Sequence, residues 1–298
     1  MKKFLSLLLT FLLIFACSSC AFSYFQGESS FTQAGFSHPA AYSAGSKAYA
    51  VDVSVHNGSI DWAAVKQSGI EYAIIRAGYC GYASGANNAD KMFEENYAAA
   101  KAAGLKIGAY YYAQPTSTSS AKSQANYFLS LVNGKSFDMP LILDIEYAAE
   151  NGKYTGKLYE SLIAKIQGIA ALCNAFCSVI KDAGYEAMIY SYYEFFASSM
   201  DASKLEYPIW IAKYTNCLEY SGSFNAWQFT SSGDVNGING NVDLSVIYVN
   251  PVKSAYTVCV AQSEDTSSST ESTNLLVTLL TAGLTLIIKL FSLIFKSF

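Results

Sequence analysis

The chain has 298 residues, enough for one large domain with additional segments or for two small domains. Its formal net charge is −4, and lysines and arginines form no cluster along the sequence, which argues against a nucleic acid as the partner. It contains only two histidines, His38 and His56, so their number excludes a zinc site built from three histidines.

The N-terminal segment has the pattern of a secretory signal. A charged start, Met1-Lys2-Lys3, is followed by a mostly apolar run over 4–16 and then by small residues. The apolar run is too short to cross a membrane comfortably. We therefore predict a signal peptide over residues 1–21, with lipidation at Cys17 as the less favoured alternative. Residues 22–47 are rich in Ser, Ala and Gly without periodicity, which indicates a linker.

From residue 48 onward, apolar runs typical of strands alternate with helical patterns. The expected strands are 48–55, 72–79, 106–113, 139–146, 186–193, 208–214, 225–231 and 241–248. The expected helices are 61–69, 90–104, 119–133 and 157–184. Such alternation is typical of a parallel α/β sheet, and after about residue 186 the strands follow one another closely. We predict a barrel over residues 48–252 that begins as β/α units and finishes as consecutive strands.

Two further segments follow the predicted barrel. Residues 262–274 are polar and of low complexity, and we interpret 253–274 as a linker. Residues 275–295 are almost entirely apolar and long enough to span a bilayer as a helix, with Lys289 and Lys296 towards their end. Polar side chains recur every three or four residues along this helix, so it could instead lie in the membrane interface. We predict a membrane anchor that holds an exported barrel on the outer face of the cell membrane or in the wall.

Cysteine usage predicts little covalent cross-linking. Of the seven cysteines, Cys17 and Cys20 lie in the signal region, and no two Cys-x-x-Cys pairs form a zinc pattern. Cys173 and Cys177 are one helical turn apart in an apolar helix, where they are most simply core residues. We predict no essential disulfide framework.

Two carboxylates lie at the end of the strand expected over 139–146. Asp144 and Glu146 are separated by one residue, so their side chains point to the same side of a strand. Two like charges in a partly dry site do not both ionise easily, and one of them should hold a proton near neutral pH, as a general acid must. An isolated Asp-x-Glu more often caps a helix or pairs with a lysine, so the rest of the chain decides.

Two more carboxylates stand at strand ends. Asp52 lies in the second half of the first expected strand, and Asp243 belongs to the last. If the strands close into a barrel, the first and last strands are neighbours, and Asp52 and Asp243 meet near Asp144 and Glu146. Four carboxylates at one mouth fit glycoside hydrolysis, in which one acid protonates the leaving oxygen and another stabilises positive charge at the anomeric carbon. They would also fit a hard metal ion such as Mg²⁺ or Ca²⁺.

A series of short motifs follows in a fixed order between residues 48 and 250. They are Val51-Asp52-Val53-Ser54 with His56-Asn57-Gly58 and Ile60-Asp61-Trp62, Ile75-Arg76-Ala77-Gly78-Tyr79, Gly108-Ala109-Tyr110-Tyr111-Tyr112, Leu143-Asp144-Ile145-Glu146, Trp210-Ile211-Ala212-Lys213-Tyr214, Trp227-Gln228-Phe229-Thr230-Ser231-Ser232-Gly233 and Val235-Asn236-Gly237-Ile238-Asn239-Gly240-Asn241-Val242-Asp243. In order and spacing they resemble the glycoside hydrolase family 25 lysozymes, also called Chalaropsis-type muramidases. Any single motif would be weak evidence, whereas the whole series is highly specific.

The resemblance implies an α/β fold, a distorted TIM-like β/α barrel whose last strands lack full helices. It implies hydrolysis of the β-1,4 bond between N-acetylmuramic acid and N-acetylglucosamine in peptidoglycan glycan strands, without a metal ion or another cofactor. By the family pattern Glu146 is the proton donor, and Asp52, Asp144 and Asp243 are the other active-site acids. The second catalytic role falls either to a carboxylate or to the substrate's own 2-acetamido group. We expect the catalytic domain to be monomeric.

Aromatic residues make up 15% of the chain, and 23 are tyrosines. This suits a surface that stacks on sugar rings, although tyrosine is also favoured in strands. The candidates for sugar contacts, with plain packing as the alternative for each, are Tyr112, Trp210, Tyr214 and Trp227. We interpret Arg76 as a buried ion-pair partner rather than a substrate clamp, because it precedes the strand end. His56 is interpreted as a hydrogen-bonding loop residue, since the carboxylates already supply acid and base.

Three functions are compatible with these observations. The first is an exported lysozyme-type hydrolase that degrades or remodels the cell wall. The second is a catalytically silent module that binds wall glycans in the same cleft, and the complete set of carboxylates speaks against it. The third is a metal-dependent hydrolase, for which the shortage of histidines excludes zinc but not Mg²⁺.

Overall fold

The computed structural model describes residues 37–39, 42, 45–163 and 168–249, which all belong to one compact unit, Met1–Cys259. The predicted signal peptide, the linker at 253–274 and the apolar segment at 275–295 lie outside the described residues. Within the described part of the chain, no helix is long and apolar enough to cross a membrane.

Among the described residues, eight strands close into a barrel. They are β1 (Ser46–Val53), β2 (Tyr72–Cys80), β4 (Lys106–Ala113), β5 (Leu141–Ile145), β8 (Ala187–Tyr192), β9 (Ile209–Ala212), β10 (Ala226–Gly233) and β11 (Val242–Val249). The α-helices are α3 (Trp62–Gln67), α4 (Phe93–Ala102), α5 (Thr118–Val132), α6 (Lys157–Ile163) and α7 (Ile169–Asp182). Each predicted strand is present, and the helix predicted over 157–184 is divided into α6 and α7.

Three short strands were not predicted. β3 (Asn87–Ala89) pairs antiparallel with the end of β2, and β6 (Ala148–Glu150) and β7 (Lys153–Thr155) form a hairpin directly after β5. They have no apolar alternation, which is why sequence periodicity does not reveal them.

The barrel is parallel except for its last strand. β11 lies antiparallel between β10 and β1, and the parallel pairing of β1 with β2 closes the ring. Because β11 runs in the opposite direction, it starts at the rim where the parallel strands end. Asp243, the second residue of β11, is therefore paired with Asp52 near the end of β1.

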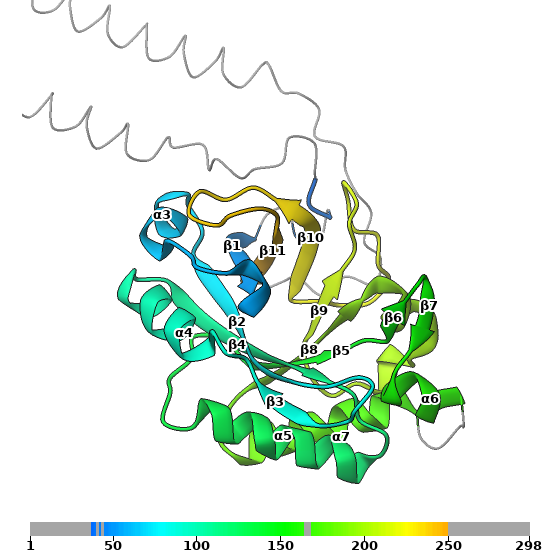
Figure 1. Cartoon of the computed structure of the whole chain (residues 1–298). Helices are drawn as coiled ribbons and strands as arrows, with labels where there is room; N and C mark the ends of the chain where they lie inside the picture. The colour runs from blue at the N-terminus through cyan, green and yellow to red at the C-terminus, as the bar shows by residue number, and fades with distance from the viewer. Residues whose placement is uncertain (1–36, 40–41, 43–44, 164–167, 250–298) are drawn as a thin grey trace, which may run out of the picture. The chain divides into compact units, whose positions relative to one another are not determined.

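The two faces of the barrel sheet pack in separate cores, because successive side chains of a strand point to opposite faces. The larger core lies between the sheet and the helices and includes Phe128 of α5 and Phe176 of α7. Figure 1 shows α5 and α7 side by side below the strands. The smaller core fills the barrel interior and consists of Ala50, Ile74, Met139, Ile142, Met188, Trp210 and Ala226. Burial on both sides explains why β5 reads as a continuous apolar run.

The connections after β8 contain no full helix in the described chain. A single π-helical turn (Phe195–Ser199) and a 3-10 turn (Ala202–Lys204) lead to β9, and a loop joins β9 to β10. This confirms the prediction that the helices vanish after about residue 186. Aromatic side chains fill part of the space, among them Tyr42, which stacks on Phe224 with a ring separation of 4.2 Å. The Tyr42 hydroxyl also accepts a hydrogen bond from the Phe224 backbone N–H.

The described cysteines are of two kinds. Cys80, Cys173 and Cys177 are buried free thiols, which confirms the core assignment of the latter two. Cys217, in the loop between β9 and β10, is disulfide-bonded. Since the other described cysteines are free, its partner lies outside the described residues. The prediction that no disulfide framework is essential stays a prediction, and the sequence pattern did not indicate that Cys217 is paired, because pairing depends on spatial proximity.

Candidate active site

The four predicted carboxylates converge at the rim where the parallel strands end. Asp52, Asp144, Glu146 and Asp243 line one small cavity of about 100 Å³. The same cavity is lined by three aromatic side chains, Tyr110, Tyr190 and Trp210. Asp144 is the fourth residue of β5 and Glu146 follows its end, so both face the interior as strand alternation requires.

Burial raises the pKa of all four carboxyl groups, and for Asp52, Asp144 and Glu146 the charges of neighbouring carboxylates add to this effect. Burial, together with the negative charge of Asp243, raises the pKa of Glu146 to about 7. Burial also raises the pKa of Asp144 well above its ordinary value, and the charges of Glu146 and Asp52 act in the same direction. The nearby Arg76 opposes this shift without overcoming it. The site therefore keeps protons on carboxyl groups near neutral pH, as a general acid requires.

Asp52 and Asp243 form a hydrogen-bonded pair supported by Gln228. The Gln228 amide nitrogen donates to both oxygens of Asp52, at 3.1 and 3.0 Å. Burial, the charge of Asp243 and a hydrogen bond to it raise the pKa of Asp52 well above its ordinary value. The same bond opposes the effect of burial on the pKa of Asp243, so Asp52 is the donor of the pair. The Gln228 carbonyl oxygen accepts from Tyr190 and Tyr214, at 2.9 and 3.0 Å.

One polar atom of the site is left open. Oδ1 of Asp144 is buried and has no hydrogen-bond partner among the described residues. Buried polar atoms in native proteins are nearly always paired, because an unpaired one loses its hydration without compensation. This oxygen therefore marks a position where a ligand group or a water molecule would bind.

A second compartment of about 380 Å³ adjoins the carboxylate cavity. It shares Tyr110, Asp144 and Glu146 with that cavity. The rest of its lining is Arg76, Tyr82, Tyr112, Tyr147, Ala148 and Ala149. Arg76 forms an ion pair with Asp90, with Nε 2.7 Å from Oδ2, so the predicted ion pair is present. Because Arg76 also lines this compartment, the ion pair does not by itself exclude a contact with substrate.

The aromatic residues proposed as sugar contacts have different surroundings. Tyr112 lines the second compartment, and its hydroxyl accepts a hydrogen bond from Gln114. Trp210 is only 2% exposed and lines the carboxylate cavity, where its indole N–H donates to Ser245. Tyr214 is 58% exposed.

Trp227 is a packing residue. Its side chain is fully buried in the core outside the barrel, and its indole N–H donates to the backbone carbonyl of Lys213. A sugar cannot reach it there, so of the two alternatives for Trp227 the structure favours packing.

Sequence reasoning missed three residues of the site. Tyr110, Tyr190 and Gln228 face the barrel interior beside the carboxylates. Tyr110 shares a strand face with Tyr112, which was the available signal, but the depth of each residue in the barrel was unknown. Tyr111 points the other way, packs on Phe128 at 5.7 Å and donates to Asn87.

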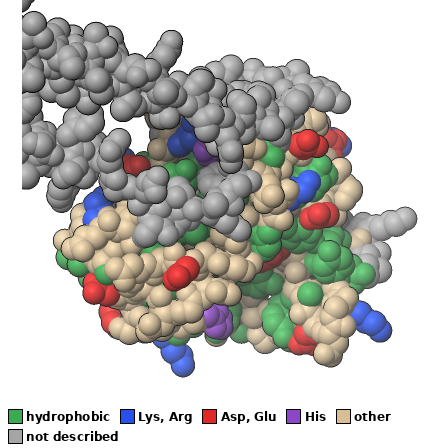
Figure 2. Space-filling view, turned by 90° about the horizontal axis from the view of Figure 1, so that it is seen from above, with side chains coloured by type: hydrophobic (Ala, Val, Ile, Leu, Met, Phe, Trp, Pro, Cys, Tyr) green, Lys and Arg blue, Asp and Glu red, His purple; other side chains and the backbone are tan. Residues whose placement is uncertain are grey.

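The other candidate features are placed away from this site. His56 is exposed on a 3-10 turn and lines none of the described cavities. No group of three or more His, Cys, Asp or Glu side chains in the described residues is arranged to hold a metal ion. Basic side chains are scattered on the face shown in Figure 2 and form no patch there.

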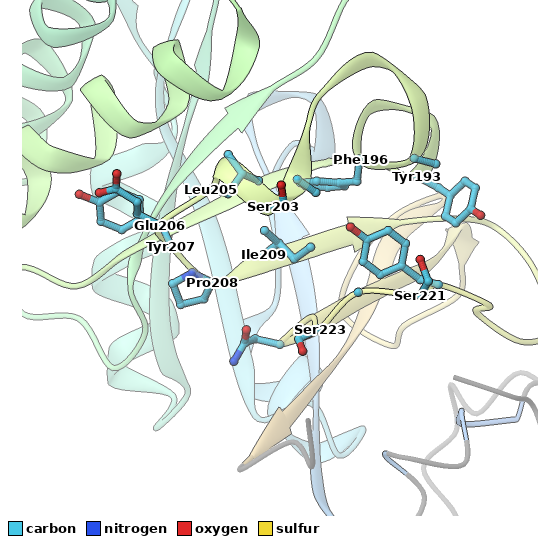
Figure 3. Close-up of a pocket in the computed structure, with 15 residues that line it drawn as sticks. Tyr193, Phe196, Ser203, Leu205, Glu206, Tyr207, Pro208, Ile209, Ser221 and Ser223 are labelled. Atoms are coloured by element: carbon cyan, nitrogen blue, oxygen red, sulfur yellow. The ribbon is translucent and has the colours of Figure 1, made fainter. Parts of the chain in front are cut away.

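A third cavity lies away from the carboxylate site and is more voluminous than the two compartments described above. It has a volume of about 880 Å³ and follows β9 on the outer wall, where full helices are missing. Figure 3 shows Tyr193 and Phe196 towards one end of it and Glu206, Tyr207 and Pro208 at the other. Glu206 is the lone ionisable carboxylate of its lining, so this cavity lacks a second acid for acid–base chemistry.

Comparisons with known proteins agree with this architecture. The family model "Glycosyl hydrolases family 25" matches residues 51–238. Over 195 residues the chain is 29% identical to the autolytic lysozyme of Clostridium acetobutylicum, covering 65% of this chain and 54% of the relative. Over 203 residues it is 30% identical to lysozyme M1 of Streptomyces globisporus, covering 65% of each. The chain thus spans about half to two thirds of the length of these relatives.

Solved structures share the fold. A bacterial lysozyme from Streptomyces coelicolor superposes with a TM-score of 0.53 at 28% identity, covering 67% of this chain and 91% of that one. The modular autolysin LytC from Streptococcus pneumoniae superposes with a TM-score of 0.58 at 26% identity, covering 68% and 47%.

Proposed function

The chain belongs to glycosyl hydrolases family 25, and from this premise we propose that it is a lysozyme-type peptidoglycan hydrolase. The bond cleaved is the β-1,4 bond between N-acetylmuramic acid and N-acetylglucosamine. The observation that carries the proposal is the cavity lined by four carboxylates, in which Glu146 has a pKa of about 7. The lysozymes among its relatives support the substrate class.

Glu146 is the proton donor in this proposal. With a pKa of about 7, a large fraction of the molecules carry a proton on Glu146 at neutral pH, yet the group loses it readily. It protonates the leaving oxygen as the glycosidic bond breaks, and the resulting carboxylate then takes a proton from the attacking water. Glu146 is only partly exposed, so bulk water does not compete freely for the proton.

The second catalytic role is assigned to the 2-acetamido group of the substrate. Asp52 is a poor nucleophile, because burial and the charge of Asp243 raise its pKa well above the ordinary value and both of its oxygens accept hydrogen bonds from Gln228. The unpaired Oδ1 of Asp144 is suited to accept the acetamido N–H. This contact turns the acetamido carbonyl oxygen towards the anomeric carbon, where it forms a bond as the leaving group departs. Asp243 stabilises the positive charge that develops there.

Sugar contacts are proposed for three aromatic residues. Tyr214 is exposed, and its hydroxyl is fixed by Gln228, so its ring is held in place to stack on a sugar. Trp210 and Tyr112 contribute walls to the carboxylate cavity and the second compartment.

A turbidity assay on purified cell walls tests the function. We expect the wild-type protein to clear the suspension with and without a chelator, and Glu146→Gln to leave it turbid. Binding to the walls without clearing would instead support the silent glycan-binding module. Loss of clearing in the chelator would support a metal-dependent hydrolase.

Export and anchoring are proposed from the sequence pattern. The signal-like residues 1–21 and the apolar residues 275–295 would place the barrel outside the cell membrane, within reach of the wall.

A further inference from the structure

We propose that the second compartment, beside Glu146, binds the 3-O-lactyl arm of N-acetylmuramic acid, and that Arg76 holds an oxygen of this arm. The inference rests on the proposed function and extends it to the part of the substrate that is recognised. Muramic acid differs from glucosamine only by this arm, which carries a methyl group and a carboxyl group, free or in amide linkage to a peptide.

Contacts along one edge of the Arg76 guanidinium fix its orientation. Its Nε donates to Oδ2 of Asp90 at 2.7 Å, and Asp90 is itself held by the backbone N–H groups of Val55 and Met92, at 3.1 and 2.9 Å. The guanidinium also lies over the ring of Tyr79, at 5.2 Å from its centre. Among the described residues its two terminal nitrogens have no hydrogen-bond partner. The fork that binds carboxylates and carbonyls is thus fixed in orientation and is not used by another described side chain.

The positive charge of Arg76 lies in a lining whose other charged residues are carboxylates. Arg76 is the one basic residue in the lining of the two compartments, which also carries four carboxylates. It is close enough to Asp144 to oppose the rise in the pKa of that group, yet Oδ1 of Asp144 has no partner. Its side chain is 13% exposed, so it is largely dehydrated, and it lines the second compartment. An oxygen ligand from the substrate would replace the lost hydration.

The walls of the compartment suit the rest of the arm. Tyr147 and the short side chains of Ala148 and Ala149 give an apolar surface for the methyl group. The hydroxyl of Tyr82 donates to the carboxylate of Glu150, which ties the loop after β2 to the β6–β7 hairpin and engages the nearest hairpin charge. The compartment is larger than the carboxylate cavity and shares Glu146 with it, so a side arm can occupy it while the sugar ring meets the acids.

The test measures ligand preference in a Glu146→Gln background, in which the ligand is not consumed. Calorimetry compares three tetrasaccharides: the muramyl tetrasaccharide with free lactyl carboxyl groups, the same compound with these groups reduced to alcohols, and chitotetraose. We expect the first to bind at least tenfold more tightly than the other two. Reducing the carboxyl groups changes only the ligand, so this comparison does not depend on any Arg76 variant being folded.

Variants of the protein then show which residue causes the preference for the ligand with free lactyl carboxyl groups. Arg76→Met should abolish it while leaving chitotetraose affinity within threefold, and Arg76→Lys should retain part of it. Lys106→Met is the matched control, because it removes one positive charge at the opposite end of the barrel, and it should change nothing. Circular dichroism melts verify that the Arg76 variants are folded, since Arg76 is paired with Asp90.

Two outcomes would overturn the inference. Equal binding of the reduced and unreduced ligands means that no group of the protein recognises the lactyl carboxyl. An equal loss of affinity for muramyl ligand and chitotetraose in folded Arg76→Met means that the compartment holds a sugar ring instead. Wall clearing by the wild-type protein is scored separately. Clearing with either of these outcomes refutes only the role of Arg76, whereas failure to clear or bind walls refutes the proposed function.

Discussion

The pH dependence of the reaction should report the surroundings of Glu146. An ordinary glutamate with a pKa of 4.5 would be protonated in roughly 0.3% of molecules at pH 7, whereas a pKa of about 7 gives roughly half. The environment thus increases the population of the acid form on the order of 150-fold at neutral pH. We expect kcat/KM to fall with rising pH through an apparent pKa near 7, and roughly tenfold for each further pH unit.

Asp243→Asn tests the cause of this shift. Burial is the largest contribution to the raised pKa of Glu146, and the charge of Asp243 is the second. Asp243→Asn removes that charge but leaves Glu146 buried. The fall of kcat/KM with rising pH, here called the alkaline limb, should therefore move to lower pH. Its apparent pKa should still lie above the 4.5 of an ordinary glutamate. The assay is kcat/KM on a soluble glycan from pH 4 to 9. The apparent pKa of the limb is measured separately from the maximal value of kcat/KM. Only the maximal value falls if Asp243 also stabilises the transition state.

Glu219→Gln serves as the matched control. It removes one negative charge from an exposed residue that lines neither compartment, and it should leave the limb where it is. A limb that stays in place in Asp243→Asn, or a wild-type limb near pH 5, would refute the electrostatic account of the site.

Further predictions concern catalysis, packing, stereochemistry and anchoring. Glu146→Gln should lower wall hydrolysis by about 10²-fold or more with unchanged thermal unfolding, and activity within tenfold of wild type would rule out its role as proton donor. Trp227→Ala should destabilise the fold by about 3–5 kcal/mol in denaturant titrations, whereas Tyr214→Ala should weaken glycan binding at unchanged stability. NMR of the first-formed product should show retention at the anomeric carbon, and inversion would contradict acetamido participation. Deleting residues 275–298 should move the protein from the membrane fraction to the medium, and release of the full-length chain by carbonate would argue against a spanning anchor.

The strands could be predicted because burial dictates their composition. β2, β4 and β5 are covered on both faces, so they appear as apolar runs between turn residues. The β6–β7 hairpin could not be predicted in this way. Its strands are short and show no apolar alternation, and it is held by neighbours such as Tyr82 that lie far away along the chain.

The carboxylates of the site could be predicted, but the network that supports them could not. Asp52, Asp144 and Glu146 stand at strand ends, where a barrel gathers its side chains. The role of Gln228 depends on the register of β10 against β11, which contains irregularities that no periodicity rule reveals. Trp210 and Trp227 look alike in sequence, yet one lines the interior of the barrel and the other its outer core.

The pairing of β1 with β11 has a consequence for biogenesis. Asp52 and Asp243 are opposite each other across these strands although they lie roughly 190 residues apart in the chain. A nascent chain that has not yet formed β11 holds Asp52 without its partner, and the edge of β1 that pairs with β11 is then open. The acid pair is therefore assembled only when the last strand of the barrel arrives. A chain that ends before β11 lacks Asp243 and cannot form this acid pair.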